Sequence, residues 1–189
     1  ADTRRGFKFE NLLYIFNHMI LNEFQIAFDQ DPTLKRVPFH SQVRCVMSLF
    51  EDLLPRIETK DVNKVYILLS KTAKENMVPC LGVLNVTKTG DIGDFYKLSD
   101  IKKKEFALKI LIESLPPIIE YLGLSLEPFI QAAEEVRKQN YNLHWEQSSK
   151  WHPSRKYRGF LSCMHEPEFF IGVLKIEDKN KNIISEKEV

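Results

Sequence analysis

The sequence lacks the features that mark most phosphate-binding, secreted and membrane-spanning proteins. It contains only 7 glycines in 189 residues, and none of them forms a glycine-rich phosphate loop. Its apolar stretches are interrupted by polar and charged residues, so we expect no segment that spans a bilayer. The 27 basic and 26 acidic residues leave a net charge of +1, which argues against a global attraction to nucleic acid or to an anionic membrane.

Cysteine is scarce as well, and the positions of the cysteines indicate the cellular compartment in which the protein lies. Cys45, Cys80 and Cys163 are odd in number, lie far apart and are set in apolar surroundings. This pattern predicts reduced, buried thiols rather than a disulfide framework. No pair has Cys-x-x-Cys spacing, and the first residues do not resemble a signal peptide. We therefore expect a soluble protein of the cytoplasm.

The chain does contain enough apolar mass for a core. Hydrophobic residues make up 43% of it and charged residues 28%, which is an ordinary globular balance. A chain of this size buries roughly 70% of its unfolded surface and needs neither a disulfide nor a metal to fold. We expect one α+β domain over residues 1–189, with a helical part at 9–56, strands and helices at 62–140, and strands at 143–185.

The first part of the chain shows helical periodicity. Apolar side chains recur in steps of four, which predicts an amphipathic helix that ends near Pro32; these are Leu12, Phe16, Ile20, Phe24 and Phe28. A second helix is predicted to begin at Ser41, as its N-cap, and to end at Pro55.

The central part is expected to contribute strands. Residues 62–69 fit either a helix or a buried strand, and we favour the strand because β-branched and aromatic residues cluster there. A second strand is predicted at 81–87. A short third strand is predicted at Phe95-Tyr96.

Two further helices are predicted after these strands. The first begins after Ser99, and Pro116-Pro117 should kink it or split it in two. Its lysines, Lys102 to Lys104, are expected on the outer face near the N-terminus, where the helix dipole does not favour them. Gly123 is a suitable C-cap, and the next helix begins at Ser125.

The last part of the chain predicts a β-meander. Residues 157–164 and 169–176 have the composition of strands, and a polar turn at 165–168 joins them. Ile183-Ile184 is expected to add an edge strand. Together with the preceding elements, this order predicts an α+β fold: a single antiparallel sheet with about four helices packed on it.

The most unusual segment crowds aromatic and basic residues together. Six of its residues are candidates for binding a partner: Trp145, Lys150, Trp151, Arg155, Lys156 and Arg158. Trp, Tyr and Arg are typical hot-spot residues of protein interfaces, and the same mixture suits nucleic-acid backbones and bases. Alternatively, the segment is a plain strand-loop-strand connection with its tryptophans in the core. Among the binding functions we favour a protein partner, because the net charge is close to neutral.

A hydrolase is the chemical alternative. His144, His152, His165 and Glu166 are residue types that hold zinc or transfer protons, so their convergence would suggest a metal- or His-dependent enzyme. No His-Glu-x-x-His or Gly-x-Ser-x-Gly motif supports it, and Cys163 lies in an apolar run where a thiol is usually inert. We therefore assign no catalytic residue, metal ligand or cofactor.

The layout resembles that of small bacterial immunity proteins, which are antidotes to polymorphic or contact-dependent toxins. The passages that carry the resemblance are residues 81–86, residues 98–105 at the opening of a long helix, and the closing strand at 169–176. The resemblance implies an inhibitor that covers a cognate toxin by protein–protein contact. It lies in size and element order rather than in a motif, so it transfers no functional residue.

Overall fold

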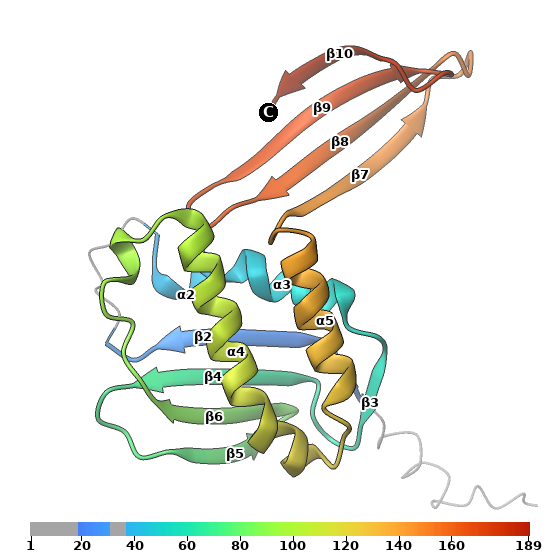
Figure 1. Ribbon diagram of the computed structural model, residues 1–189. Helices are drawn as coiled ribbons and strands as arrows, with labels where there is room; N and C mark the ends of the chain where they lie inside the picture. Colours follow the sequence, from blue (N-terminus) through green and yellow to red (C-terminus); the bar gives the residue numbers. More distant parts are fainter. Residues whose placement is uncertain (1–18, 31–36) are drawn as a thin grey trace, which may run out of the picture.

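In the computed structural model, which describes residues 19–30 and 37–189, helices pack on a mixed sheet and a second large sheet projects from this body (Figure 1). The mixture of helices and strands and the C-terminal meander are confirmed, and the described residues contain four helices, which agrees with the expected number. The prediction of a single sheet is wrong, because the described strands form three sheets.

The body contains a four-stranded sheet in the order β2-β4-β6-β5. Its members are β2 (Glu23–Phe28), β4 (Lys64–Ser70), β6 (Val83–Thr89) and β5 (Asn76–Cys80). The first three run parallel to one another, and β5 is antiparallel to β6. A small antiparallel pair, β1 (Met19–Leu21) and β3 (Ile57–Thr59), extends the body beside it.

The first predicted helix is wrong wherever it can be compared with the structure. Residues 19–28 form β1 and β2, and the earlier residues of that prediction lie outside the described chain. The step of four was misleading because it is a multiple of the strand period of two as well as close to the helical period. Phe24, Ile26 and Phe28 are alternately placed in β2 and all three are buried.

Two of the three strands predicted in the central part of the chain are confirmed. The strand alternative for residues 62–69 is confirmed by β4, and the strand at 81–87 is confirmed by β6. The predicted strand at Phe95-Tyr96 is wrong, since Phe95–Lys97 is a short 3-10 helix. The ring of Phe95 packs at 4.8 Å from that of Phe39, which draws this segment into the core instead of onto a sheet edge.

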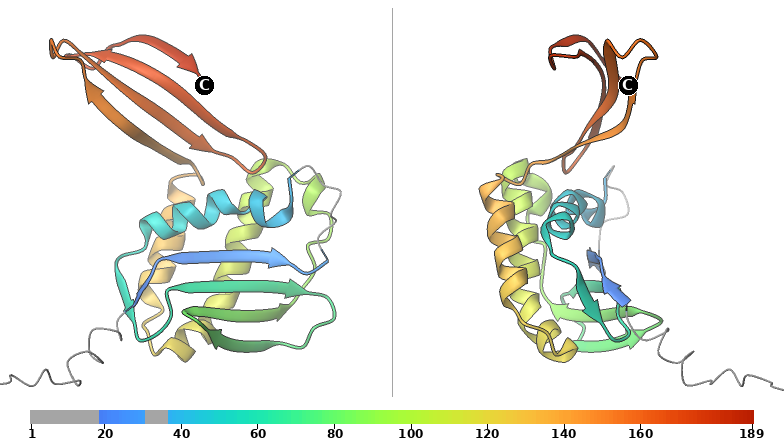
Figure 2. Two further views of the ribbon diagram at one scale, coloured as in Figure 1. Left: turned by 180° about the vertical axis from the view of Figure 1, so that it is seen from behind. Right: turned by 90° about the vertical axis from the view of Figure 1, so that its right-hand side faces the viewer.

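The helices α2 (Phe39–Gln42), α3 (Arg44–Leu53), α4 (Asp100–Leu122) and α5 (Glu127–Lys138) form the other layer. The prediction of a helix ending at Pro55 is confirmed, although Ser41 lies inside α2 instead of capping it. Figure 2 shows α4 and α5 side by side on one face of the body, with α3 crossing near its β2 edge.

Helix α4 continues through its two prolines. Pro116 and Pro117 lie inside one uninterrupted helix, so the predicted split is wrong. The predicted C-cap is confirmed: Gly123 has a φ of 67°, and the amide of Leu124 donates to the carbonyl of Ile119 at 3.0 Å. The next helix begins at Glu127, two residues after the predicted start at Ser125. The hydroxyl of Ser125 accepts a hydrogen bond from the amide of Glu127 at 3.4 Å.

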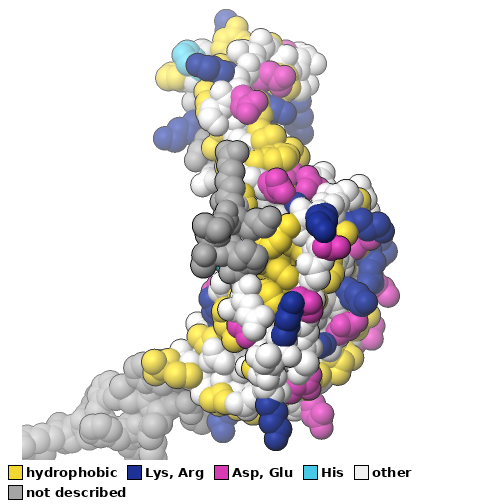
Figure 3. All heavy atoms as spheres, turned by 90° about the vertical axis from the view of Figure 1, so that its left-hand side faces the viewer, with side chains coloured by type: hydrophobic (Ala, Val, Ile, Leu, Met, Phe, Trp, Pro, Cys, Tyr) yellow, Lys and Arg dark blue, Asp and Glu magenta, His cyan; other side chains and the backbone are white. Residues whose placement is uncertain are grey.

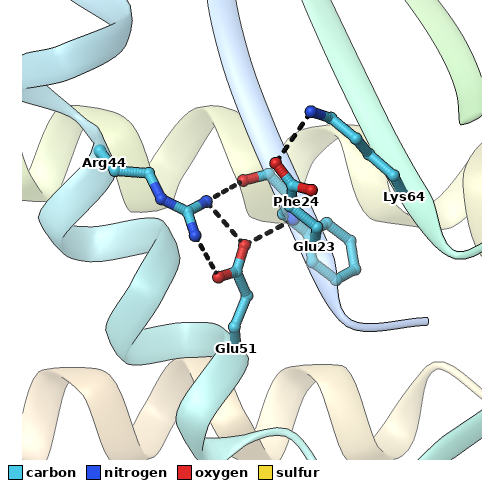
Figure 4. A network of polar contacts seen from close by, with 5 residues as sticks. All are labelled: Glu23, Phe24, Arg44, Glu51 and Lys64. Carbon is cyan, nitrogen blue, oxygen red and sulfur yellow. Dashed lines mark hydrogen bonds and ion pairs between the residues drawn. The ribbon is translucent and has the colours of Figure 1, made fainter. Parts of the chain in front are cut away.

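Side chains of α3 satisfy the backbone of the edge strand β2 (Figure 4). The carboxylate of Glu51 accepts from the amide of Phe24 at 2.6 Å, and the guanidinium of Arg44 donates to the Phe24 carbonyl at 3.0 Å. Arg44 and Glu51 also pair with each other in a two-pronged contact at 2.9 and 2.7 Å. Burial raises the pKa of Glu51, although the hydrogen bonds from Arg44 and Phe24 act in the opposite direction. These contacts satisfy the backbone groups of Phe24 at the open edge of β2.

The C-terminal meander is the sheet that projects from the body (Figure 1). Its strands are β7 (Leu143–Trp151), β8 (Tyr157–His165), β9 (Phe170–Asp178) and β10 (Ile183–Glu188), in the order β10-β9-β8-β7. All neighbours are antiparallel, and the predicted turn at 165–168 joins β8 to β9. The sequence prediction is confirmed here.

Two lysines of α4 tie this meander to the body. Lys103 and Lys104 are buried, so the prediction that they lie on the outer face is wrong. The ammonium of Lys104 lies 2.6 Å from the Glu166 carboxylate, and Lys103 pairs with Glu168. Both glutamates come from the turn between β8 and β9. Only Lys102 of the three lysines is exposed as predicted.

Replacing Lys104 with methionine leaves the Glu166 carboxylate as an uncompensated charge in a nearly buried position. We expect K104M to lose about 3 kcal/mol of unfolding free energy, measured by urea denaturation. The matched control is K102M, because Lys102 pairs with Glu105 at the exposed surface and its removal should change stability by less than about 0.5 kcal/mol. Equal losses in the two variants would contradict a buried role for Lys104.

Candidate binding surface on the C-terminal sheet

The register of the meander separates its side chains into two unlike faces. Residues paired across antiparallel strands point to the same face, and successive residues of one strand alternate between faces. One face, called the apolar face below, carries Trp145, Leu161, Phe170, Leu174 and Ile176. The opposite face, called the polar face, carries charged groups and also Phe160, Met164, Ile171 and Val173, all of which are buried or half-buried. The strands carry these side chains away from the body along the sheet.

Among the described residues, those of the body contact the apolar face at its base. Trp145 packs against the core of the body, with its ring 5.6 Å from that of Phe170. The other large side chains remain exposed: Phe170, at the base beside Trp145, is 56% exposed, and further out Leu174 is 45% and Ile176 36% exposed. Eight of the fourteen exposed large hydrophobic residues in the described chain belong to the meander or its turns, so the exposure is concentrated there. Figure 3 shows hydrophobic side chains on the surface of the projecting sheet.

The opposite, polar face is closed by its own ion network. The guanidinium of Arg158 pairs with Glu146 and with Glu177, each at 2.9 Å, and donates to the Ser149 hydroxyl at 2.5 Å. It also lies 5.0 Å from the ring centroid of Phe160, which is buried. Arg158 was a candidate partner contact from the sequence. Its positive charge is paired with two carboxylates of the same sheet, those of Glu146 and Glu177.

The residues of the hydrolase alternative are not brought together. His165 lies on the apolar face, 6.1 Å from the Phe170 ring, and burial lowers its pKa. His144 lies on the polar face, and His152 lies in the turn at the far end of the sheet. Within residues 19–30 and 37–189, no group of three or more His, Cys, Asp or Glu side chains is placed to hold a metal ion.

One pair on the polar face has the composition of a nucleophile and its base. The Nε2 atom of His144 lies 2.7 Å from the hydroxyl of Ser162. No described carboxylate is hydrogen-bonded to this histidine, and the strand of Ser162 pairs with a neighbour on each side, so the local backbone amides are committed to the sheet. The contact is therefore a cross-strand hydrogen bond without an oxyanion site.

The three cysteines differ in their exposure. All three are unpaired, and Cys45 and Cys163 are buried as predicted, whereas Cys80 is exposed on β5 against the prediction. Burial raises the pKa of Cys45 to about 11, so almost none of it is thiolate at neutral pH.

The free end of the meander gathers positive charge from two turns. The pairing of Tyr157 with Asp178 places the β7–β8 turn beside the β9–β10 turn. Five exposed cations lie on these turns and beside them, and none makes an ion pair with a described residue; these are Lys150, Arg155, Lys156, Lys179 and Lys181, called the basic tip below. The sequence indicated the first three. Lys179 and Lys181 were missed because only the register brings them close.

A hollow joins the basic tip to the apolar face. It has a volume of about 460 Å³ and is lined by Lys150, Trp151, His152, Tyr157, Gly159, Ile176 and Ile184. Trp151 is 52% exposed at this hollow, so it is an available aromatic contact. Of the candidates from the sequence, Lys150, Trp151, Arg155 and Lys156 thus share the tip, whereas Trp145 lies at the base.

No protein-family model, curated protein or solved structure matches this chain. No helix of the described residues is long and apolar enough to cross a membrane. The function is therefore argued from the surface itself.

Replacing Arg158 with methionine leaves the buried Glu177 carboxylate without its partner. We expect R158M to lose about 2 kcal/mol of unfolding free energy. R155M removes the same charge from an exposed turn and should change stability by less than about 0.5 kcal/mol. Urea denaturation of both variants separates a structural arginine from a surface one, and an R158M variant as stable as R155M would refute the structural role.

Proposed function

We propose that this protein binds another protein through the apolar face of its C-terminal sheet. The observation that carries the proposal is the unequal treatment of the two faces: the polar face is closed by Arg158, while Phe170, Leu174 and Ile176 stay exposed. A sheet with one apolar face is stabilised by covering that face. Contiguous exposed apolar surface of this kind is typical of interaction sites.

The arrangement of the surface suits an interface. Aromatic and aliphatic side chains lie at its centre, with charged side chains at the tip and at the edge strand, which is the pattern of an apolar core and a polar rim. The apolar face lies on paired strands rather than on loops, so little conformational entropy is lost when a partner binds.

We favour a different protein over a second copy of this chain. Two copies stacked with their strands in the same direction would bring their basic tips together, and like charges oppose that contact. Blocking a site on the partner is the mode of action that the sheet supports best. An immunity protein that neutralises a toxin, as the sequence layout resembles, is one specific form of this proposal.

Site-specific crosslinking in the native host tests the proposal. A photo-crosslinking amino acid at Leu174 should capture a partner protein, and the same group at Glu120, on the exposed side of α4, should not. The captured protein is then purified and its affinity measured by calorimetry. We expect L174K to weaken binding by about 2 kcal/mol, roughly 30-fold, because it places an ammonium in the apolar centre of the interface.

The control variant is E120K, which should bind as the unmodified protein does. Leu174 is exposed, so L174K is expected to keep the melting temperature, and a loss of binding then reports on the surface and not on folding. Light scattering measures whether the protein is a dimer. A dimer that L174K dissociates would show that the apolar face binds a second copy of this chain. That result, or unchanged binding of L174K to the captured protein, would overturn the proposal.

A further inference from the structure

We propose that the basic tip recognises an acidic patch of the partner protein, next to the surface that the apolar face binds. This inference rests on the proposed function and adds the chemical class of the partner. The partner surface that we infer is a protein surface rich in Asp and Glu, not a nucleic acid.

The charge at the tip is available to a partner. The five cations of the basic tip are exposed and unpaired among the described residues, although the chain as a whole carries a net charge of only +1. Two of the nearby acidic groups, Glu146 and Glu177, pair with Arg158. Asp178 keeps its negative charge and interacts electrostatically with Lys179, so one carboxylate faces five cations. The tip therefore carries a local excess of positive charge, which favours an anionic surface.

The backbone at the tip shows how its charge can be removed without disturbing the turns. Arg155 and Lys181 have φ angles of 53° and 65°, so each of the two turns places a basic residue in the left-handed region. Glycine or asparagine is favoured at such positions, and a long side chain is disfavoured. Each turn is closed by an ordinary backbone hydrogen bond. The Arg155 amide donates to the backbone carbonyl of His152, and the Lys181 amide donates to the backbone carbonyl of Asp178. The turns do not require these side chains, so both can be replaced with glycine while the turns are kept.

The surroundings of the tip favour a protein over a nucleic acid. The hollow beside the cations is lined by the aliphatic side chains of Ile176 and Ile184 as well as by Trp151 and Tyr157. Bases stack on aromatic platforms that follow a basic groove, whereas here the cations cluster at one end of an apolar face. A protein surface with an apolar centre and an acidic border is complementary to this arrangement.

The double variant R155G/K181G tests the inference with the fold preserved. Glycine is favoured at both left-handed positions, so we expect a melting temperature equal to or above that of the unmodified protein. The control is K60Q/K74Q, which removes the same charge from two exposed lysines of the body. Fluorescence anisotropy measures the binding of a labelled poly-L-glutamate peptide and of a labelled oligo-dT of equal length, at low and at moderate salt.

We expect the protein to bind poly-L-glutamate in a salt-sensitive manner, with about fivefold weaker binding for R155G/K181G and less than about twofold for K60Q/K74Q. Equal weakening by both double variants would show a general charge effect and overturn the inference. Tighter binding of oligo-dT that depends on the same tip residues would overturn it in favour of a nucleic acid. If R155G/K181G has no effect while L174K still weakens binding to the captured protein, the inference fails and the proposed function stands.

Discussion

The position of the C-terminal sheet depends on two lysines whose side chains are buried. Lys103 and Lys104 are buried near the N-terminus of α4, and Glu168 and Glu166 neutralise them. A buried ammonium without a carboxylate costs several kcal/mol, so this part of α4 requires the turn that carries both glutamates. Because that turn lies at one end of the meander, the pairs hold the near end on the body and leave the far end to project (Figure 1).

The projection decides what each face of the sheet offers. The polar face is satisfied by contacts within the sheet, centred on Arg158, and its groups have little left for a partner. Among the described residues, the apolar face meets the core of the body at Leu143 and Trp145, and Leu174 and Ile176 further out remain exposed. The same geometry carries two turns that are distant in sequence to one free end, where their cations accumulate. Apolar surface and unpaired charge therefore lie on the part of the molecule that is farthest from its core.

Local sequence patterns predicted the elements that rest on local physics. The hairpin strands at 157–164 and 169–176, the glycine cap at Gly123 and the strand at 62–69 were each indicated by composition and turn chemistry. The failure at 19–28 has an equally local cause, since a step of four fits a strand as well as a helix. Phe95 was misassigned because its partner Phe39 lies far away in the sequence.

The sequence by itself determined the existence of the α4 and α5 helices, the C-terminal meander and a concentration of aromatic and basic residues near it. The tertiary structure decided which of those residues are available. Pairing across strands occupied Arg158 with two carboxylates, buried part of Trp145 against the body, and added Lys179 and Lys181 to the tip. The physical reason is that exposure and ion pairing depend on neighbours brought together by strand register, and register is set by contacts between segments that no local pattern contains.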